Sequence, residues 1–302
     1  MDISSKKKTV LKTPLLIFLF GVSLVWLLCC CRSVPESQVP STVSIIGDPD
    51  AQQKLLLIIA SSYPDKISSV EFLNNDWTML VCGERFYFAR GRFLPEKLRE
   101  QWEEYYPYDF YTYPWTGTAR QRRAAFEYPV YSIGSSFLFD VLYASPTEDD
   151  SWDWQEKYSF LGVKMLIHPH VKPLFDRVSD RIRDAAQTDP SVEEWIAELK
   201  TGSPGGWNWR SIANTNRRSN HSYGIAVDLL PGDLRGRLTY WQWNASDTID
   251  GAAYYTPPEA VIKAFEDHGF IWGGKWNLFD TMHFEYRPEI LLLNGFVIDN
   301  QH

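Results

Sequence analysis

Residues 208–231 read NWRSIANTNRRSNHSYGIAVDLLP, and they place His221 seven positions before Asp228. On a helix this spacing would put both side chains on one face, but Gly224 and the β-branched residues after it disfavour a helix. On one unbroken strand the odd spacing would put the two side chains on opposite faces. The remaining geometry is a turn at Gly224, with His221 before the turn and Asp228 on the strand after it. Such a turn brings an imidazole and a carboxylate together.

A second stretch, residues 272–285, reads WGGKWNLFDTMHFE and supplies another histidine and two carboxylates. Asp280 stands three residues before His283, and Glu285 stands two residues after it. We expect a strand over residues 282–286, on which His283 and Glu285 share one face. Two histidines, one aspartate and a spare carboxylate are the side chains that a catalytic zinc site requires.

The N-terminus has the pattern of a targeting segment. Four lysines precede an apolar run over residues 14–28, which is short for a membrane-spanning helix. The run ends in Cys29, Cys30 and Cys31, which resemble the site at which bacterial lipoproteins are cleaved and lipidated. The small residues usual before such a cysteine are missing, so an uncleaved membrane anchor is the alternative. Both alternatives predict an exported protein that is held at a membrane of the cell envelope.

The remainder of the chain is acidic. Of 30 Lys and Arg and 38 Asp and Glu residues, residues 1–31 hold four lysines and one aspartate, which leaves 26 basic and 37 acidic residues and a formal net charge of −11. Such a surface disfavours nucleic acid as a partner. Cys82 is the one cysteine outside the N-terminal segment, so an intrachain disulfide framework is excluded there. We expect its thiol to be a small, buried apolar group.

Changes in composition divide the chain into four predicted segments. Residues 1–31 are the targeting or anchor segment, and residues 32–50, rich in Ser, Pro and Val, are a linker. Residues 51–150 form an N-terminal subdomain of unknown role, and residues 151–302 form the domain that contains the histidines. Within the subdomain, residues 77–93 predict a β-hairpin connected by a Gly-Glu pair.

Helices are predicted where apolar residues recur at helical spacing between Pro and Gly residues. These segments are residues 95–104, 171–186, 191–201 and 258–268. Residues 51–62 fit either a helix or a buried strand. Residues 105–115 are dense in Tyr and Pro, which predicts irregular structure. This segment is either an aromatic loop that lines a cleft or a packed part of the subdomain.

Three further histidines are expected to have structural roles. His168 and His170 flank a proline, and a His-x-His pair can bind a metal ion, but no carboxylate stands near them in the sequence. We expect His268 at the C-terminus of a helix, where the helix dipole favours a cation.

The residues around His221 and His283 resemble a known family. Residues 219–228 (SNHSYGIAVD) match the SxHxxGxAxD signature of the D-alanyl-D-alanine carboxypeptidase (VanY-like) and L-alanyl-D-glutamate endopeptidase family of zinc peptidases. Residues 269–274 (GFIWGG) and 280–285 (DTMHFE) are similar to the second signature of that family. The resemblance covers roughly residues 155–290 and leaves residues 32–150 unassigned.

The resemblance implies that His221, Asp228 and His283 bind one zinc ion and leave a fourth position for water. It assigns the general base to Asp280. The spacing on the predicted strand leaves Glu285 as a rival base, or as a residue that orients His283 through its other ring nitrogen.

Arg210 matches an arginine that precedes the histidine motif in the endopeptidase-like branch of the family. In that position it would bind a substrate carboxylate or stabilise the oxyanion. The fold that the resemblance implies is α+β. It consists of a small antiparallel sheet that carries the zinc ligands, helices packed on this sheet, and here an N-terminal subdomain that contains the β-hairpin.

The function favoured by these observations is an exported zinc metallopeptidase, a hydrolase that cleaves the stem peptides of peptidoglycan in the cell wall. It would act as a D-Ala-D-Ala carboxypeptidase or as an L-Ala-D-Glu endopeptidase. The alternatives are a non-catalytic binding module stabilised by zinc and a structural lipoprotein of the envelope. A binding module has no need of Asp280, and only the aromatic segment 105–115 favours the structural lipoprotein.

Overall fold

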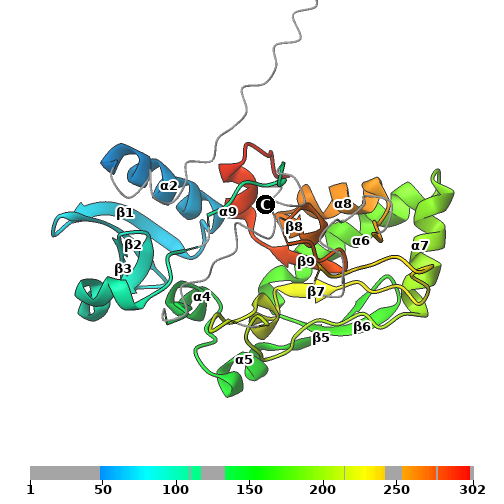
Figure 1. Cartoon of the computed structure of the whole chain (residues 1–302), viewed down its shortest axis with the longest axis horizontal. Coiled ribbons are helices and arrows are strands. Elements are labelled where there is room, and N and C mark those ends of the chain that lie inside the picture. Colours follow the sequence, from blue (N-terminus) through cyan, green and yellow to red (C-terminus); the bar gives the residue numbers. More distant parts are fainter. Residues whose placement is uncertain are drawn as a thin grey trace, which may run out of the picture. The chain divides into compact units, whose positions relative to one another are not determined.

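Three antiparallel sheets and the helices that cover them make up the part of the chain that the computed structural model describes (Figure 1). This part comprises residues 48–108, 110–116, 133–213, 215–241, 254–276 and 278–299. The combination of helices with small antiparallel sheets confirms the predicted α+β fold. The predicted anchor segment lies outside the described residues, as does the linker up to residue 47. Within the described residues, no helix has both the length and the apolar character needed to cross a membrane.

A four-stranded antiparallel sheet forms most of the N-terminal region. Its strands pair in chain order, β1 (Ile67–Leu73), β2 (Asp76–Val81), β3 (Glu84–Ala89) and β4 (Arg92–Pro95). A two-residue turn joins each pair, and both residues of each turn have positive φ. This backbone conformation defines the tight hairpin turns whose twist matches that of the strands. The predicted hairpin over residues 77–93 is therefore confirmed.

The turn between β2 and β3 corrects two expectations. Val81 pairs with Glu84, so the connection is Cys82-Gly83 and lies one residue earlier than predicted. Cys82 has a φ of 49° and an exposed side chain, so the expectation that this thiol is buried was wrong. The physical reason is the turn itself, which projects from the sheet and presents its side chains to solvent.

Helix α2 (Pro49–Ser62) settles the alternative between a helix and a strand near residues 51–62. The side chain of Asp48 accepts hydrogen bonds from two backbone N–H groups of the first turn, as an N-cap residue does. Leu55, Leu56 and Ile59 recur at helical spacing and are buried. Helix α2 contacts β1 and β2, so it covers the N-terminal sheet (Figure 1).

Two helices and a hairpin precede the histidine motif and were not predicted. They are α4 (Phe137–Leu142), α5 (Glu148–Trp154), β5 (Glu156–Phe160) and β6 (Val163–Ile167). The helices predicted next are confirmed, with ends shifted by one residue. They are α6 (Lys172–Ala186) and α7 (Pro190–Lys200).

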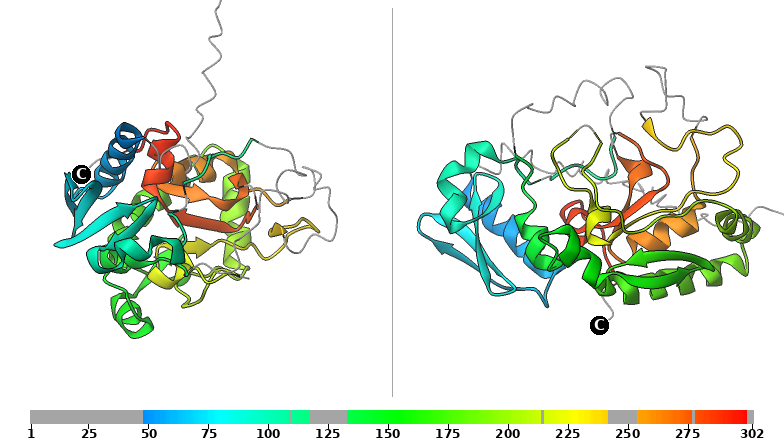
Figure 2. Two further views of the ribbon diagram at one scale, coloured as in Figure 1. Left: turned by 60° about the vertical axis from the view of Figure 1, so that its left-hand side comes forward. Right: turned by 90° about the horizontal axis from the view of Figure 1, so that it is seen from below.

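The third sheet has three short strands in the order β7-β9-β8. Their bounds are β7 (Ala226–Asp228), β8 (Phe270–Trp272) and β9 (His283–Tyr286), which confirms the strand predicted over residues 282–286. Helix α8 (Glu259–Glu266) packs against β8, and α9 (Pro288–Leu293) follows β9 and contacts α2. In Figure 2 the yellow strand β7 lies beside the orange-red strand β9.

Short 3-10 helices connect several of these elements. They are η1 (Glu96–Glu104), η2 (Pro169–Val171), η3 (Asn220–Tyr223) and η6 (Gly273–Lys275). Thus the helix predicted over residues 95–104 is present as 3-10 turns that are interrupted by a kink at Gln101. The three shorter elements are brief connections, which the tighter 3-10 geometry suits.

A continuous cluster of buried apolar side chains includes both the N-terminal region and the histidine-bearing region. Leu56 and Phe88 belong to it, as do Phe265 and Phe284, whose rings stack with their centroids 4.1 Å apart. The predicted division between residues 51–150 and 151–302 stays a prediction. Among the described residues of the aromatic segment 105–115, the buried side chains are Tyr105, Phe110 and Tyr113.

Candidate metal centre

The turn around Gly224 fixes His221. Ser219 caps η3, and its hydroxyl accepts a hydrogen bond from the backbone N–H of His221 at 3.4 Å. Gly224 ends η3 with a φ of 69°, and a Cβ there would lie 2.0 Å from Oε1 of Gln155. Only glycine meets both demands without strain. The predicted arrangement is therefore confirmed, with His221 before the turn and Asp228 on the strand after it.

Strand pairing brings Asp228 to His283. The two residues are direct partners in the antiparallel pair of β7 and β9, and partners of this kind project from the same face. Oδ1 of Asp228 lies 3.0 Å from Nδ1 of His283 and 3.2 Å from Nε2 of His221. The two ring nitrogens are 3.1 Å apart. Three side chains from two separate motifs thus meet in one triangle.

The outer hydrogen bonds decide which ring nitrogens carry protons. Nδ1 of His221 lies 2.7 Å from the carbonyl oxygen of Gly206, which can only accept, so this nitrogen donates. Nε2 of His283 lies 3.1 Å from Oε2 of Glu285 and donates to that carboxylate. In the neutral form that metal binding requires, each imidazole turns a lone pair toward Asp228. Three acceptor atoms converge, and a cation is the species that satisfies all of them.

The dimensions of the triangle suit zinc. Ligand atoms at about 2.0–2.1 Å from a tetrahedral zinc ion lie about 3.3 Å from one another, close to the distances of 3.0–3.2 Å found here. His221, Asp228 and His283 are also the group of metal-binding side chains that stands out among the described residues. The donor set of two imidazoles and one carboxylate is that of a catalytic zinc site.

The pKa of His283 reports the same convergence of negative charge. Burial alone lowers this pKa, but hydrogen bonds with Asp228 and Glu285 raise it to about 10. The carboxylates thus favour positive charge at the position where a metal ion would supply it.

Asp280 has the character of a poised base. Its Oδ1 atom is buried and has no hydrogen-bond partner among the described residues. Burial raises its pKa to about 7, the charge of Asp228 acts in the same direction, and the charges of His283 and Arg210 oppose them. A carboxylate whose pKa lies near neutrality can both take and return a proton.

Glu285 lies on the other side of His283. Its Oε2 atom accepts hydrogen bonds from Nε2 of His283 and, at 2.8 Å, from the side-chain amide of Asn220. Burial raises its pKa, but the hydrogen bond and charge of His283 and the charge of Arg287 lower it to about 2. Its position, behind the ring nitrogen that points away from the triangle, suits a residue that orients His283.

Arg210 presents an exposed guanidinium near Asp280. Its backbone N–H donates to the hydroxyl of Ser222 at 2.9 Å, which fixes the main chain at this point. Its charge lowers the pKa of both Asp280 and Tyr240. An exposed cation beside the candidate base is well placed to meet a substrate carboxylate.

The other described histidines have structural contacts, as expected. His168 is buried, its Nδ1 atom accepts a hydrogen bond from the backbone N–H of His170, and burial lowers its pKa to about 4. Nδ1 of His268 lies 2.7 Å from the carbonyl oxygen of Ala264, one helical turn earlier. These contacts occupy the rings away from the triangle.

One residue that supports the site was not predicted. Gly206 supplies the carbonyl that orients His221, and a Cβ at this glycine would lie 2.1 Å from the carbonyl oxygen of Leu166. The paired glycines at 205–206, directly before the histidine stretch, are the one sequence signal that could have indicated such a close approach.

Comparison with known proteins agrees with this geometry. A family model described as a domain of unknown function matches residues 55–110, in the N-terminal region. A second model, described as D-alanyl-D-alanine carboxypeptidase, matches residues 213–286. Neither a curated protein nor a solved structure matches the chain. The segment that contains the metal triangle, Asp280 and Glu285 therefore resembles the D-alanyl-D-alanine carboxypeptidases.

Proposed function

We propose that the chain is a zinc-dependent peptidase that cleaves the stem peptides of peptidoglycan. The observation that carries this proposal is the triangle of His221, Asp228 and His283, in which three acceptor atoms converge and both ring protons are bound elsewhere. The triangle lies within the segment that matches the carboxypeptidase model. Together they favour a zinc hydrolase over a protein with an incidental histidine pair.

Each residue of the site has a different role in the proposed reaction. When bound, zinc would supply a Lewis acid and make a water molecule acidic enough to attack a peptide carbonyl. Asp280 takes the proton of the attacking water and returns it to the leaving amine. Glu285 holds His283 in the tautomer that offers Nδ1 to the metal. Arg210 binds a carboxylate of the substrate.

A substrate with free carboxylates suits the exposed cation of Arg210, whose charge acts on Asp280. Stem peptides meet this requirement at the terminal D-Ala and at the α-carboxylate of D-Glu. Two bonds are therefore candidates, the D-Ala-D-Ala bond and the L-Ala-D-Glu bond. They give different products, which a single assay distinguishes.

Mass spectrometry of purified muropeptides after incubation with the zinc-loaded protein tests the proposal. Loss of one terminal alanine identifies a carboxypeptidase, and separation of the peptide after L-Ala identifies an endopeptidase. Asp280→Asn is the control that removes the base, and His170→Gln is a histidine control outside the triangle. Unchanged muropeptides with a fully zinc-loaded wild-type protein would contradict the proposed activity.

A non-catalytic, zinc-stabilised binding module is the second candidate. It would leave Asp280 without a function, although this residue keeps a buried carboxylate oxygen with no partner among the described residues. Such an atom is costly to bury unless substrate or water uses it. The structural lipoprotein is less well supported, because the tyrosine-rich segment that favoured it has Tyr113 buried at 2% exposure.

We also propose that the protein is exported and anchored by its N-terminus. This proposal rests on the basic stretch and the apolar run that ends in Cys29, Cys30 and Cys31. Membrane fractionation and mass spectrometry of the mature N-terminus test it. A lipid on one of these cysteines would identify a lipoprotein, an intact N-terminus in the membrane fraction would identify an anchor, and an intact soluble cytoplasmic chain would contradict both.

A further inference from the structure

A row of buried charged side chains extends away from the metal triangle. His283, Glu285, Arg287 and Glu289 are alternate residues, and each is at most 6% exposed. Beyond the contact of His283 with Glu285, Nη1 of Arg287 lies 3.5 Å from Oε1 of Glu285. Nε of Arg287 donates to Oε1 of Glu289 at the start of α9. Charges therefore alternate in sign along this row, from the carboxylate of Glu285 behind the metal ligand, through Arg287, to the fully buried carboxylate of Glu289.

The far end of this row, Glu289, contacts the N-terminal region. The hydroxyl of Tyr63 donates to Oε2 of Glu289 at 2.8 Å, and the hydroxyl of Tyr108 donates to Oε1 at 2.9 Å. Tyr63 is the C-cap residue of α2 and is 1% exposed. Both tyrosines lie within residues 55–110, the segment that matches a domain of unknown function. Two hydrogen bonds thus connect that segment to Glu289, the last member of the row.

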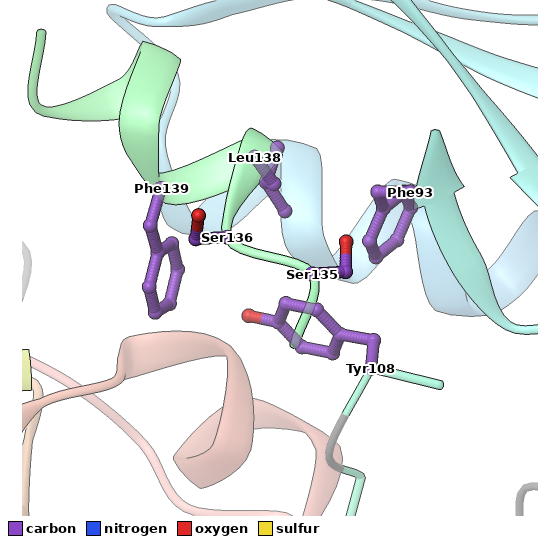
Figure 3. Close-up of a pocket in the computed structure, with 6 residues that line it drawn as sticks. All are labelled: Phe93, Tyr108, Ser135, Ser136, Leu138 and Phe139. Atoms are coloured by element: carbon purple, nitrogen blue, oxygen red, sulfur yellow. The ribbon is translucent and has the colours of Figure 1, made fainter. Parts of the chain in front are cut away.

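Aromatic rings also fix Arg287. Its guanidinium carbon lies 5.4 Å from the ring centroid of Tyr108 and 5.3 Å from that of Phe139, within the range of cation–π contact. Figure 3 shows the rings of Tyr108 and Phe139 together at the edge of a small cavity. The cavity volume is about 30 Å³, which holds about one water molecule. The two ring contacts and the ion pairs with Glu285 and Glu289 therefore hold the guanidinium of Arg287 in place.

Such a network depends on all of its members. A buried ion pair that loses one partner leaves an uncompensated charge, and the remaining groups must then rearrange. Glu289 without its tyrosine donors would compete with Glu285 for Arg287, and Glu285 sets the orientation of His283. The residues that support a metal ligand influence metal affinity as well as stability.

We propose that Tyr63 and Tyr108 are positioning residues for the metal centre, and that residues 55–110 serve as a support of this centre through Glu289 and Arg287. This inference rests on the metal site of the proposed function, but not on the identity of the bond that is cut. It gives the segment of unknown function a role in holding His283, a residue that lies outside that segment.

Zinc affinity of the full chain, measured by competition with a chelator, tests the proposal. The near-isosteric change Tyr108→Phe removes one donor and keeps the ring over Arg287, and the double variant with Tyr63→Phe removes both. We expect zinc binding to weaken by a few-fold in the single variant and by about 10-fold in the double variant, at the low end for residues behind a ligand. The visible spectrum of the cobalt-substituted protein should change in parallel, because it reports ligand geometry.

Tyr255→Phe is the matched control. Tyr255 is 2% exposed and accepts a hydrogen bond from Nε1 of Trp195. The change to phenylalanine therefore also removes a buried hydroxyl contact, but one outside the row of charged side chains. We expect this variant to keep wild-type zinc affinity and an unchanged cobalt spectrum at a similar loss of melting temperature. Wild-type affinity and spectrum in Tyr108→Phe and in the double variant would overturn the proposal, and if the double variant does not fold, Tyr108→Phe alone decides. A protein that binds zinc but leaves muropeptides intact would contradict the proposed activity only.

Discussion

Strands β3 and β9 are both largely buried, but they bury different chemistry. The four buried residues of β3 are Phe86, Tyr87, Phe88 and Ala89. The four buried residues of β9 include His283 and Glu285. Burial of aromatic side chains stabilises the fold by itself, whereas a buried imidazole or carboxylate is tolerated only when it is hydrogen-bonded or paired.

The two strands differ in how specific their partners must be. The N-terminal sheet consists of local hairpins with an apolar interior, and any adequately packed set of side chains could serve there. Strand β9 needs specific partners, namely Asp228 on β7, Asn220 on η3 and Arg287 after the strand. Changes on β3 should therefore act on folding, and changes on β9 should act on the metal and on catalysis.

The largest effect is expected from the metal ligands. His221→Ala and His283→Ala, alone or together, should reduce zinc from about one ion per chain to none and abolish peptidase activity, because the two ligands left in a single variant, or the one left in the double variant, do not hold zinc tightly. Elemental analysis of the purified variants measures this directly. Full zinc occupancy in the double variant would show that the ion binds elsewhere.

The next largest effect should separate the two carboxylates. Asp280→Asn keeps the shape of the side chain and removes the proton acceptor, so turnover should fall by at least ~10²–10⁴-fold with zinc still bound. Glu285→Gln should weaken zinc binding by ~10–100-fold and reduce turnover less, since it acts through His283. Activity and zinc content are measured on both variants. If Glu285→Gln stops turnover with zinc intact while Asp280→Asn has little effect, the two roles are exchanged.

A core change on β3 should show the opposite pattern. Phe86 is 2% exposed, and Phe86→Ala should lower the free energy of unfolding by about 3–5 kcal/mol. Zinc affinity under native conditions should stay close to that of the wild type. Denaturant unfolding and chelator competition give the two quantities. Phe72→Ala, at a site 57% exposed, is the control and should cost about 0.5 kcal/mol or less. A large loss of zinc affinity in the folded Phe86 variant would erase the distinction between the two strands.

The smallest effect is expected at the turn before β3. Cys82 has a positive φ that asparagine adopts more readily, and Asn-Gly is a preferred pair in turns of this type. Cys82→Asn should therefore raise the free energy of unfolding by up to about 1 kcal/mol, without a change in zinc content. Thermal unfolding of the two proteins compares them. A clear destabilisation would mean that the cysteine makes a contact beyond the turn.

Local signals made part of this structure predictable. Gly224 and the residues after it predict the turn that presents His221, and the alternation around His283 predicts its strand. The triangle itself depends on the pairing of β7 with β9, which the sequence alone does not state. The three candidate zinc ligands could be named from the sequence because two separate motifs agree in order and content with the signatures of the family that the chain resembles.

Other parts were not predictable because their partners are far apart in the chain. Glu289 meets Tyr63 across 226 positions and Tyr108 across 181 positions, and no local pattern indicates such contacts.

Two local turns gave too weak a signal for a different reason. The hairpin of β5 and β6 turns at Leu161-Gly162, where a leucine with positive φ gives no usual turn signal. The turn at Cys82-Gly83 was misplaced by one residue, since a cysteine in a tight turn runs against its preference for burial.

The late position of β9 has a consequence for the order of assembly. The hairpins of the N-terminal sheet involve neighbours in the chain, so they can form early in folding. The metal triangle cannot form before β9 does, because His283 on this strand follows Asp228 by 55 positions. Until β9 is in place, the nascent protein holds only two of the three candidate ligands, His221 and Asp228, so the triangle can be completed only near the end of folding.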